Sequence, residues 1–458
     1  MTIKRLSVSG SEPVSSNERC CQCHAAYQIP DEHKPGMWLP EHYQMRNEFV
    51  RQIVARASPE RGLQSPALRR FQNFIESNPR ILMYFSHMFE EVPRQHPSGK
   101  DSAGGDRISD YKHMLAVLDY ILRSAPDWTT AASGVGLVGL PMFAVMDSVL
   151  GTTNGYAAFL DPDVNVHIKD ILDEWGMYLQ SSASRHVLDT HELGWFCPAA
   201  IQALTRCAND PNQSNHKFDE LYDCDSNDAH YGFKSWDDFF TRRIRTGVRP
   251  VAEPDDDDVL VHACESVAYN LEERVNLRDN FFVKGQPYSP QDMLANDPLA
   301  AYFARGTVYQ AFLSALAYHR WHAPVSGVVR RAFVQAGTYF SLPSWMGVAS
   351  MEDNPDRMVP SQSYLSAMAT RGIVIIEADN REIGLVAFVA VGMSEVSTCD
   401  VTVREGQHVV KGDETGMFRF GGSSYCLLFR HGLRLDGLPD VQNEESCAVR
   451  SKFATVRR

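Results

Sequence analysis

The sequence predicts an α+β protein in which a helical N-terminal region precedes a β-rich region. Two observations predict this order. Up to about residue 232, apolar side chains recur at three- and four-residue spacing, which is the period of helices buried on one face. Beyond it, short apolar runs bounded by turn residues predominate, as is typical of strands. We expect a flexible polar tail over residues 1–36, a helical domain over 37–232 and a β-rich domain over 233–458.

The expected helices begin at recognisable start signals. Pro40, Ser65-Pro66 and Asn78-Pro79 stand at first turns, where the missing N–H of proline costs no hydrogen bond. Aromatic residues such as Trp175 share the apolar face of these helices, and we interpret them as core rather than as a cofactor site. Later helices are expected over residues 108–124, 167–180, 198–207 and 236–243.

The β-rich region contains short apolar runs that we interpret as strands. Asp379-Asn380 predicts the turn of one hairpin, and residues 341–363 show so little periodicity that we expect a long loop or lid. The expected strands cover residues 259–262, 281–283, 327–334, 373–377, 383–391, 398–403 and 425–429.

Composition excludes several classes of partner. The formal charge of −13 leaves no basic surplus for a nucleic acid or an anionic membrane surface. The longest apolar stretch, residues 135–150, is interrupted by glycine, proline and aspartate, so no membrane span is expected. The N-terminus lacks the apolar core of a secretory signal, and ten cysteines without a framework indicate reduced thiols. We therefore expect a cytoplasmic protein.

Three further patterns resemble functional motifs, but each has a simpler structural explanation. Cys20 to His24 match the C-x-x-C-H pattern of haem attachment, but a leaderless tail favours accidental clustering. Gly134 to Gly139 fit G-x-G-x-x-G, but no strand precedes them, so a nucleotide site is not predicted. Asp255 to Asp258 are interpreted as a solvated loop, with cation binding left open.

Near the C-terminus, Gly421-Gly422-Ser423-Ser424 joins two apolar runs. Glycines at such a corner fit a kinked hairpin, and alone the four residues favour that interpretation. The alternative is chemistry at the backbone, because no side chain shields the carbonyl of Gly422 from the neighbouring serine hydroxyl.

Two other features of the β-rich region could act together with Ser423 in one site. His319 and His322 are three residues apart, which favours two separate roles over a shared metal, and no further ligands stand at zinc spacing. Glu265 follows a short apolar run and is either a solvated strand end or the residue that orients a histidine. Glu265, His322 and Ser423 have the residue types of a relay that activates a hydroxyl. No metal is expected, and no G-x-S-x-G elbow indicates an α/β-hydrolase.

These residues resemble the phosphatidylserine decarboxylase family. Gly421 to Ser424 stand where that family has its Leu-Gly-Ser-Thr self-cleavage motif, and Tyr318 to His322 resemble its Tyr-His-Arg-x-His segment. This resemblance covers about residues 233–431. Phe74 to Ser77, Trp175-Gly176 and Tyr231 to Phe233 carry a second and closer resemblance, to a soluble fungal branch of the family, the L-tryptophan decarboxylases of psilocybin biosynthesis, and it extends over the helical half. Further motifs in the family's order are Asp237 to Arg243, Arg249-Pro250, Val283 to Gly285, Gly392 to Val396 and Lys411 to Phe418.

The resemblance implies a β-rich decarboxylase domain that cleaves itself between Gly422 and Ser423. Ser423 attacks the Gly422 carbonyl with His322 as base and Glu265 orienting it, and the serine becomes a covalent pyruvoyl group on the 423–458 fragment. The larger chain then has this fragment as its partner. The pyruvoyl group forms a Schiff base with an amino-acid substrate and replaces pyridoxal phosphate as electron sink. His319 is implied as the acid that protonates the carbanion.

The implied reaction is decarboxylation of an aromatic L-amino acid, L-tryptophan to tryptamine and carbon dioxide. We expect Tyr339, Phe340 and Trp345 to line the site for the indole ring. Two positions depart from the phosphatidylserine enzymes, which have Asp where Glu265 stands and Leu where Gly421 stands. The alternatives are a phosphatidylserine decarboxylase and a non-catalytic scaffold that keeps the fold.

Overall fold

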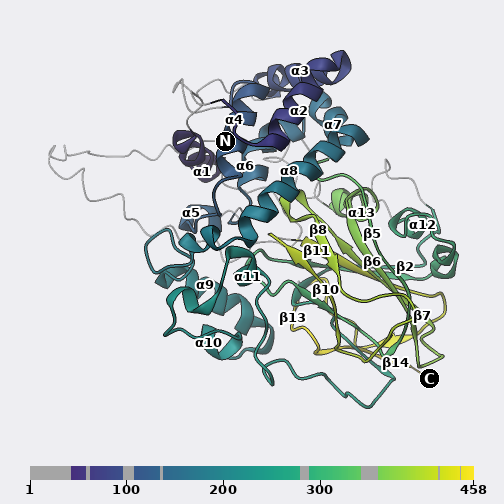
Figure 1. Ribbon diagram of the computed structural model, residues 1–458. Coiled ribbons are helices and arrows are strands. Elements are labelled where there is room, and N and C mark those ends of the chain that lie inside the picture. The colour runs from purple at the N-terminus through teal and green to yellow at the C-terminus, as the bar shows by residue number, and fades with distance from the viewer. Residues whose placement is uncertain are drawn as a thin grey trace, which may run out of the picture. The chain divides into compact units, whose positions relative to one another are not determined.

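Helices predominate in the first half and strands in the second half of the part of the chain that the structure describes, so the α+β prediction is confirmed (Figure 1). The computed structural model describes residues 43–57, 62–95, 108–134, 138–278, 288–341, 359–420, 423–443 and 445–457. Residues 34–458 form one compact unit. The predicted tail and the C-x-x-C-H pattern lie outside the described residues.

The longer helices of the first half begin where a side chain or a proline prepares the first turn. Ser65 accepts a hydrogen bond from the N–H of Leu68 and caps α2, and Asp161 caps α8 through the N–H groups of Asp163 and Val164. The helices are α1 (Tyr43–Arg56), α2 (Pro66–Ser77), α3 (Pro79–Gln95), α4 (Tyr111–Ile121), α5 (Thr130–Gly134), α6 (Pro141–Leu150), α7 (Thr153–Leu160), α8 (Pro162–Gln180), α9 (Pro198–Asn209), α10 (Phe218–Leu221), α11 (Trp236–Phe240), α12 (Pro290–Met293) and α13 (Val359–Met368).

The strands form antiparallel sheets. The largest has the order β13-β2-β3-β11-β7-β6-β5-β9, and two three-stranded sheets have the orders β4-β10-β8 and β1-β14-β12. The strands are β1 (Val259–Val261), β2 (Ser266–Glu273), β3 (Thr307–Leu313), β4 (Arg320–His322), β5 (Gly327–Gln335), β6 (Arg371–Ala378), β7 (Leu385–Val391), β8 (Thr398–Val401), β9 (His408–Val409), β10 (Glu414–Arg419), β11 (Ser423–Phe429), β12 (Leu435–Asp436), β13 (Ser446–Cys447) and β14 (Lys452–Val456).

Strand β11 lies in the middle of the eight-stranded sheet, where every residue from Ser423 to Phe429 is buried. It pairs with β3 on one side and with β7 on the other. Because β11 is buried on both faces, its residues after the two serines form a continuous apolar run. That run is the signal from which the strand was predicted. The turn predicted at Asp379-Asn380 joins the paired strands β6 and β7.

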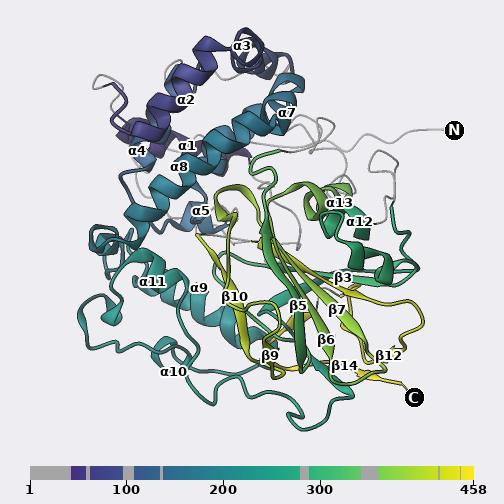
Figure 2. The ribbon, with the colours of Figure 1, turned by 45° about the vertical axis from the view of Figure 1, so that its right-hand side comes forward.

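Hydrogen bonds between the helical half and the β-rich half hold the helices in place. The carboxylate of Glu395 accepts hydrogen bonds from the N–H groups of Met142 and Phe143, at the first turn of α6. Asn165 of α8 accepts a hydrogen bond from the N–H of Tyr339. Figures 1 and 2 both show α8 running from the other helices of the helical half towards the strands.

Several local predictions differ from the structure. The helix expected over residues 236–243 ends at Phe240. The strands that were not expected are β2, β3, β4, β9, β10, β12, β13 and β14. Strand β3 carries the buried Gln310 in the middle of its apolar run, and β2 is half-buried over most of its length, including Asn270. Such polar interruptions hide a buried strand from a search for apolar runs. The strand expected over 281–283 lies outside the described residues.

The ammonium group of Lys411 is held by the linker that contains the four consecutive aspartates. It donates hydrogen bonds of 2.7, 2.8 and 2.9 Å to the carbonyl oxygens of Glu253, Asp256 and Val259. The positive charge beside this acidic loop is therefore supplied by the protein's own lysine.

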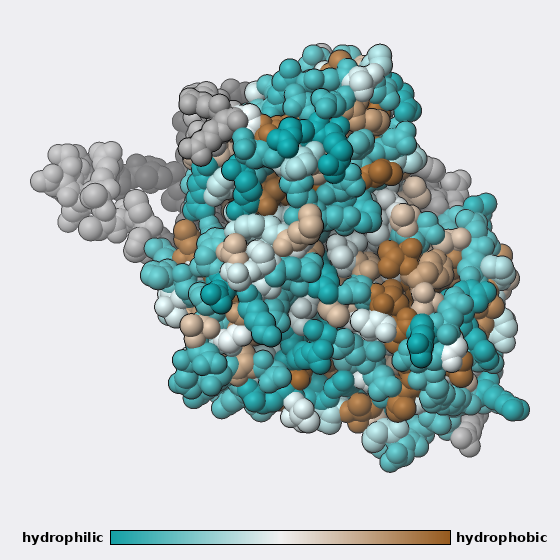
Figure 3. Space-filling model, viewed as in Figure 1, coloured by the Kyte–Doolittle hydropathy of each residue, from teal (hydrophilic) through white to brown (hydrophobic). Residues whose placement is uncertain are grey.

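Most of the face shown in Figure 3 is hydrophilic, with brown atoms gathered mainly over the β-rich half. None of the helices in the described part of the chain combines the length and the apolar character that crossing a bilayer requires. The large apolar side chains that are exposed in the described part of the chain are spread over both halves: Met83, Val166, Met177, Leu193, Tyr302, Val334 and Val410.

Candidate active site

Ser423 is the first residue of β11 and lies opposite Leu313 of β3. Its side chain is fully buried, and its Oγ has no hydrogen-bond partner among the described residues. Leaving a buried hydroxyl unpaired costs about 1–3 kcal/mol, so such a position calls for an explanation other than stability. Gly421 and Gly422 lie outside the described residues.

His319 is also fully buried, and neither of its ring nitrogens has a hydrogen-bond partner among the described residues. Its ring stacks on Phe240 of α11 with 4.1 Å between ring centroids. Its carbonyl oxygen accepts a 2.9 Å hydrogen bond from the N–H of Phe418, so it lies beside the end of β10 that leads to Ser423. Burial holds the pKa of His319 well below its usual range, and the charge of Arg242 lowers it further.

His322, in β4, differs from His319 in that both ring nitrogens are paired. Nδ1 lies 2.9 Å from the carbonyl oxygen of Gly412 and Nε2 lies 3.0 Å from the hydroxyl of Tyr318. Because a carbonyl only accepts, the proton belongs on Nδ1, and Nε2 accepts from the tyrosine. Burial, with the charge of Arg450, lowers the pKa of His322 to about 3, so the ring is neutral at pH 7.

The carboxylate of Glu265 is held by Arg249 rather than by a histidine. Arg249 donates two hydrogen bonds to it, of 2.5 and 3.2 Å, and the N–H of Val449 donates a third of 2.9 Å. The structure connects Glu265 to His322 only through the backbone, since the N–H of His322 donates to the carbonyl of Ala263.

The structure does not bring Ser423 into hydrogen-bond contact with either relay partner. The pairing runs from Val267 in β2 through Phe312 in β3 to Ser424 in β11. Residues of β2 and β11 at the same level are therefore two strand spacings apart, or roughly 10 Å. Ser423 and Glu265 lie near the same end of the sheet without touching.

A buried polar network fixes the residue after Ser423. The Oγ of Ser424 accepts a 3.1 Å hydrogen bond from Gln310 Nε2, and Gln310 Oε1 accepts one of 2.6 Å from the hydroxyl of Tyr288. Asn270 donates to the same hydroxyl at 3.1 Å. Successive strand residues point to opposite faces, so this network lies on the other face from Ser423. Sequence reasoning missed it, although a glutamine inside an apolar run was a usable signal.

The residues expected to line a substrate pocket are only partly described. Tyr339 and Phe340 are buried beside the helical half, where the ring of Phe340 lies 6.2 Å from that of Phe159. The carbonyl of Tyr339 accepts a hydrogen bond from the N–H of Ser394. Trp345 lies outside the described residues, as does most of the expected lid.

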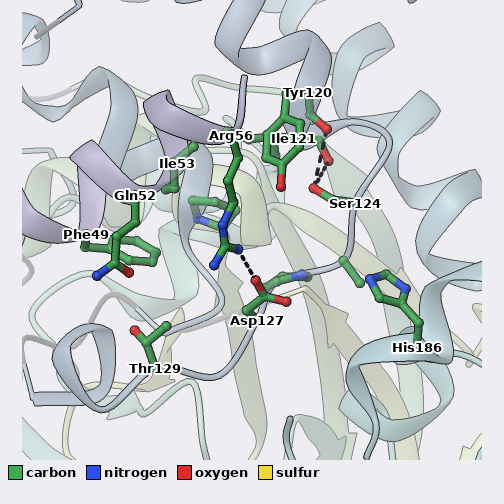
Figure 4. A pocket seen from close by; sticks show the side chains of 13 residues that line it. Phe49, Gln52, Ile53, Arg56, Tyr120, Ile121, Ser124, Asp127, Thr129 and His186 are labelled. Atoms are coloured by element: carbon green, nitrogen blue, oxygen red, sulfur yellow. Dashed lines mark hydrogen bonds and ion pairs between the residues drawn. The ribbon is translucent and has the colours of Figure 1, made fainter. Parts of the chain in front are cut away.

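A cavity of about 210 Å³ lies in the helical half, away from all of these residues. Figure 4 shows Arg56 and Asp127 pointing towards each other across it, joined by an ion pair. A more polar cleft of about 320 Å³ is lined by residues that include Thr241, Arg242 and Arg320, next to the His319 segment. Neither cavity is lined by the predicted catalytic residues, and the described residues contain no group of three or more His, Cys, Asp or Glu side chains that could hold a metal.

Comparison with known proteins identifies the family. Two models of phosphatidylserine decarboxylase match the chain, one over residues 65–204 and the other over residues 236–455. The chain is 37% identical to L-tryptophan decarboxylase of Psilocybe cubensis, with 89% of this chain and 90% of that protein covered. It is 43% identical to the decarboxylase iboD of Amanita muscaria over 64% of this chain and 84% of that protein. It is 34% identical to phosphatidylserine decarboxylase proenzyme 3 of Schizosaccharomyces pombe over 43% of this chain and 19% of that protein.

The chain therefore belongs to the phosphatidylserine decarboxylase family. Within that family it is a decarboxylase related to the fungal L-tryptophan decarboxylases. Proenzymes of the family use a pyruvoyl group.

Proposed function

We propose that this protein cleaves itself between Gly422 and Ser423 and then decarboxylates an aromatic L-amino acid, with L-tryptophan as the preferred substrate. The observation that carries the proposal is the buried, unpartnered Oγ of Ser423 at the start of β11, directly after two glycines. A serine hydroxyl in this position serves first as nucleophile and later as leaving group.

The proposed cleavage uses only the chain and one water. Ser423 Oγ adds to the carbonyl carbon of Gly422, the C–N bond between the two residues breaks, and an ester replaces the amide. Loss of the α-proton of Ser423 expels the Gly422 carboxylate from Cβ and leaves dehydroalanine. Addition of water to its imine form releases ammonia and leaves a pyruvoyl group at residue 423.

The position suits a pyruvoyl group. Ser423 is fully buried, so a ketone there is shielded from water, and the neighbouring Ser424 is fixed by Gln310. The group supplies an electron sink for the electron pair that remains when carbon dioxide leaves the substrate. The chain's own residues must then bind the substrate, exclude water and return a proton.

We propose His322 as the base for cleavage, through Nε2. The hydrogen bond that Nδ1–H donates to the carbonyl of Gly412 fixes the tautomer that leaves Nε2 basic, and the hydroxyl of Tyr318 must turn away to free that nitrogen. In this proposal Glu265 orients His322 through the backbone. Arg249 and Val449 fix Glu265, and the carbonyl two residues before it holds the N–H of His322.

We propose His319 as the group that returns a proton to the substrate carbon. Because no side chain among the described residues pairs with either ring nitrogen, a neutral ring can give a proton from one side and regain one on the other. Tyr339, Phe340 and Trp345 are proposed to bind the aromatic side chain. The preference for tryptophan is supported by the Psilocybe cubensis relative, which matches 89% of this chain, whereas the Schizosaccharomyces pombe phosphatidylserine decarboxylase matches only 43%.

Incubation of the purified protein with L-tryptophan, and separately with phosphatidylserine vesicles, tests the proposed reaction. We expect tryptamine and carbon dioxide from the first and no phosphatidylethanolamine from the second. The Ser423→Ala variant is the matched control and should form neither product. Product from vesicles alone would identify a phosphatidylserine decarboxylase. An uncut chain with no activity on either substrate would support a non-catalytic scaffold.

A further inference from the structure

We infer that the helical half positions the cleavage site through Phe420, which Trp175 and Gly176 of α8 hold in place. This inference rests on the proposed self-cleavage. It assigns a positioning role to a helix outside the residues 236–455 that match the second family model.

The backbone of Phe420 is held in an unfavourable conformation. Its φ of 82° lies in the left-handed region, which residues with a Cβ rarely adopt. Phe420 is separated from Ser423 only by the two glycines of the corner. A strained residue at this point persists only if its surroundings hold it there, and strain of this kind is concentrated at functional sites.

The contacts that hold Phe420 come from α8. Its side chain is 1% exposed, and its ring centroid lies 6.0 Å from that of Trp175. A Cβ added to Gly176 would stand 3.3 Å from the Cε2 and Cζ atoms of the same ring, so a larger residue there would push the Phe420 ring by a few tenths of an ångström or more. Trp175 is itself fixed, because its Nε1 donates a 3.0 Å hydrogen bond to the carbonyl of Ser124.

The preceding residue is anchored as well. Arg419 donates hydrogen bonds of 2.5 Å to Asp237 of α11 and 2.8 Å to Asp400 of β8. On the other side of the corner, backbone pairing with β3 and β7 fixes β11. The two glycines therefore span two fixed points, and the position of Phe420 limits where the Gly422 carbonyl can lie relative to Ser423 Oγ.

The consequence is kinetic. An intramolecular attack depends steeply on alignment, and a misplacement of about 1 Å costs about 100-fold in rate. If α8 sets the alignment, loosening or displacing the Phe420 ring slows cleavage. It leaves the chemistry of any chain that has been cut unchanged.

Substitutions on both sides of the contact test this inference. Phe420→Ala removes the ring, whereas Gly176→Ala and Gly176→Leu push against it by increasing amounts. Ala and Leu have similar helix propensities, so a graded effect reports the contact rather than the stability of the helix. Trp128→Phe is the control, since Trp128 is equally buried in the helical half and none of its ring contacts involves Phe420.

The measurements are the half-time of cleavage on a denaturing gel, the melting temperature, and the turnover per cut chain. We expect Phe420→Ala and Gly176→Leu to slow cleavage by about 10- to 100-fold. Gly176→Ala should slow it less, and Trp128→Phe should leave it unchanged. Phe420→Leu, which refills part of the space, should recover part of the rate. Cut chains of every variant should turn over substrate at the wild-type rate.

Wild-type cleavage rates in Phe420→Ala and in both Gly176 variants would overturn the inference. A second result would also overturn it: a cleavage rate that falls only in proportion to the melting temperature, in Trp128→Phe as well as in the Phe420 and Gly176 variants. Gly176→Ala adds a single methyl group to a helix, so it remains informative if the larger changes prevent folding. Failure of the proposed function is distinguishable, because the wild-type chain itself would then remain whole.

Discussion

The β-rich half contains two kinds of buried polar side chain, and the difference between them separates stability from chemistry. The carboxylate of Glu265 and the hydroxyl of Ser424 each accept hydrogen bonds, from Arg249 and Gln310 respectively. Ser423 and His319 are buried as deeply but have no side-chain partner among the described residues. Paired groups contribute to folding, whereas unpaired ones oppose it. Other buried side chains such as His262 also have an unpaired atom, so the missing partner alone does not identify a site, and the place of Ser423 directly after two glycines is the second observation that does.

Substitution of the unpaired serine has the largest expected effect. We predict that Ser423→Ala abolishes cleavage and decarboxylation, because no hydroxyl remains to attack Gly422. Its melting temperature should stay at the wild-type value or rise, since an unpaired buried hydroxyl is removed. Denaturing electrophoresis and thermal unfolding measure the two quantities. Two chains from this variant would show that Ser423 is not the nucleophile.

Substitution of the unpaired histidine should separate the two reactions. His319→Phe keeps a ring stacked on Phe240 but removes both nitrogens. We predict a normally cut chain whose decarboxylation falls by about 10²- to 10⁴-fold, the usual contribution of a proton-transfer group. His262→Phe is the matched control, because His262 is also buried with an unpartnered Nδ1 but packs against Phe453 instead. Equal losses in both variants would contradict the assigned role.

Breaking a paired group should instead cost stability. Glu265→Gln leaves the buried charge of Arg249 uncompensated, and we predict a loss of about 3–5 kcal/mol in the free energy of unfolding. Denaturant titration measures it. Combining Glu265→Gln with Arg249→Met should destabilise less than the sum of the two single changes. Additive losses would show that the pair does not act as a unit.

The buried histidines predict a pH dependence of stability. Burial lowers the pKa of His322 and of His262 from 6.5 to about 3, so the unfolded chain binds protons that the folded one does not. The stabilisation from keeping these rings neutral is present above pH 6.5 and is lost as pH falls from 6.5 towards 3. Each ring contributes about 1.4 kcal/mol per pH unit in that window. Unfolding titrations should show a shallower slope for His262→Phe, and an unchanged slope would contradict this account.

The smallest effect is expected at the paired serine. Ser424→Ala removes one neutral hydrogen bond from Gln310 and should cost about 1 kcal/mol in unfolding free energy. Cleavage should proceed, since the nucleophile is intact. If the Ser424→Ala chain is not cleaved, Ser424 takes part in cleavage, and the distinction between paired and unpaired groups is weakened.

The sequence predicted the fold class and the buried strand β11, because apolar periodicity is a local property. It also predicted Trp175 as a core residue, which its complete burial confirms. It did not predict β3, whose buried Gln310 is explained only by Ser424 and Tyr288 from distant segments.

The site was predicted by residue type but not in its contacts. The pairing of His322 with Gly412 depends on how β4 meets the segment that leads into β10, which spacing along the chain does not encode. The pairing of Glu265 with Arg249 joins two segments outside these strands and is equally absent from any local pattern. The contact between α8 and Phe420 likewise joins residues about 240 positions apart, beyond any local pattern.

The intact mass of the denatured protein tests the central claim most directly. We predict two chains, residues 1–422 and residues 423–458, with the smaller one beginning in a pyruvoyl group in place of Ser423. Its mass should be lower than that of the unmodified 423–458 peptide by the difference between a serine terminus and a pyruvoyl terminus. A single uncut chain of 458 residues that decarboxylates L-tryptophan would contradict the account.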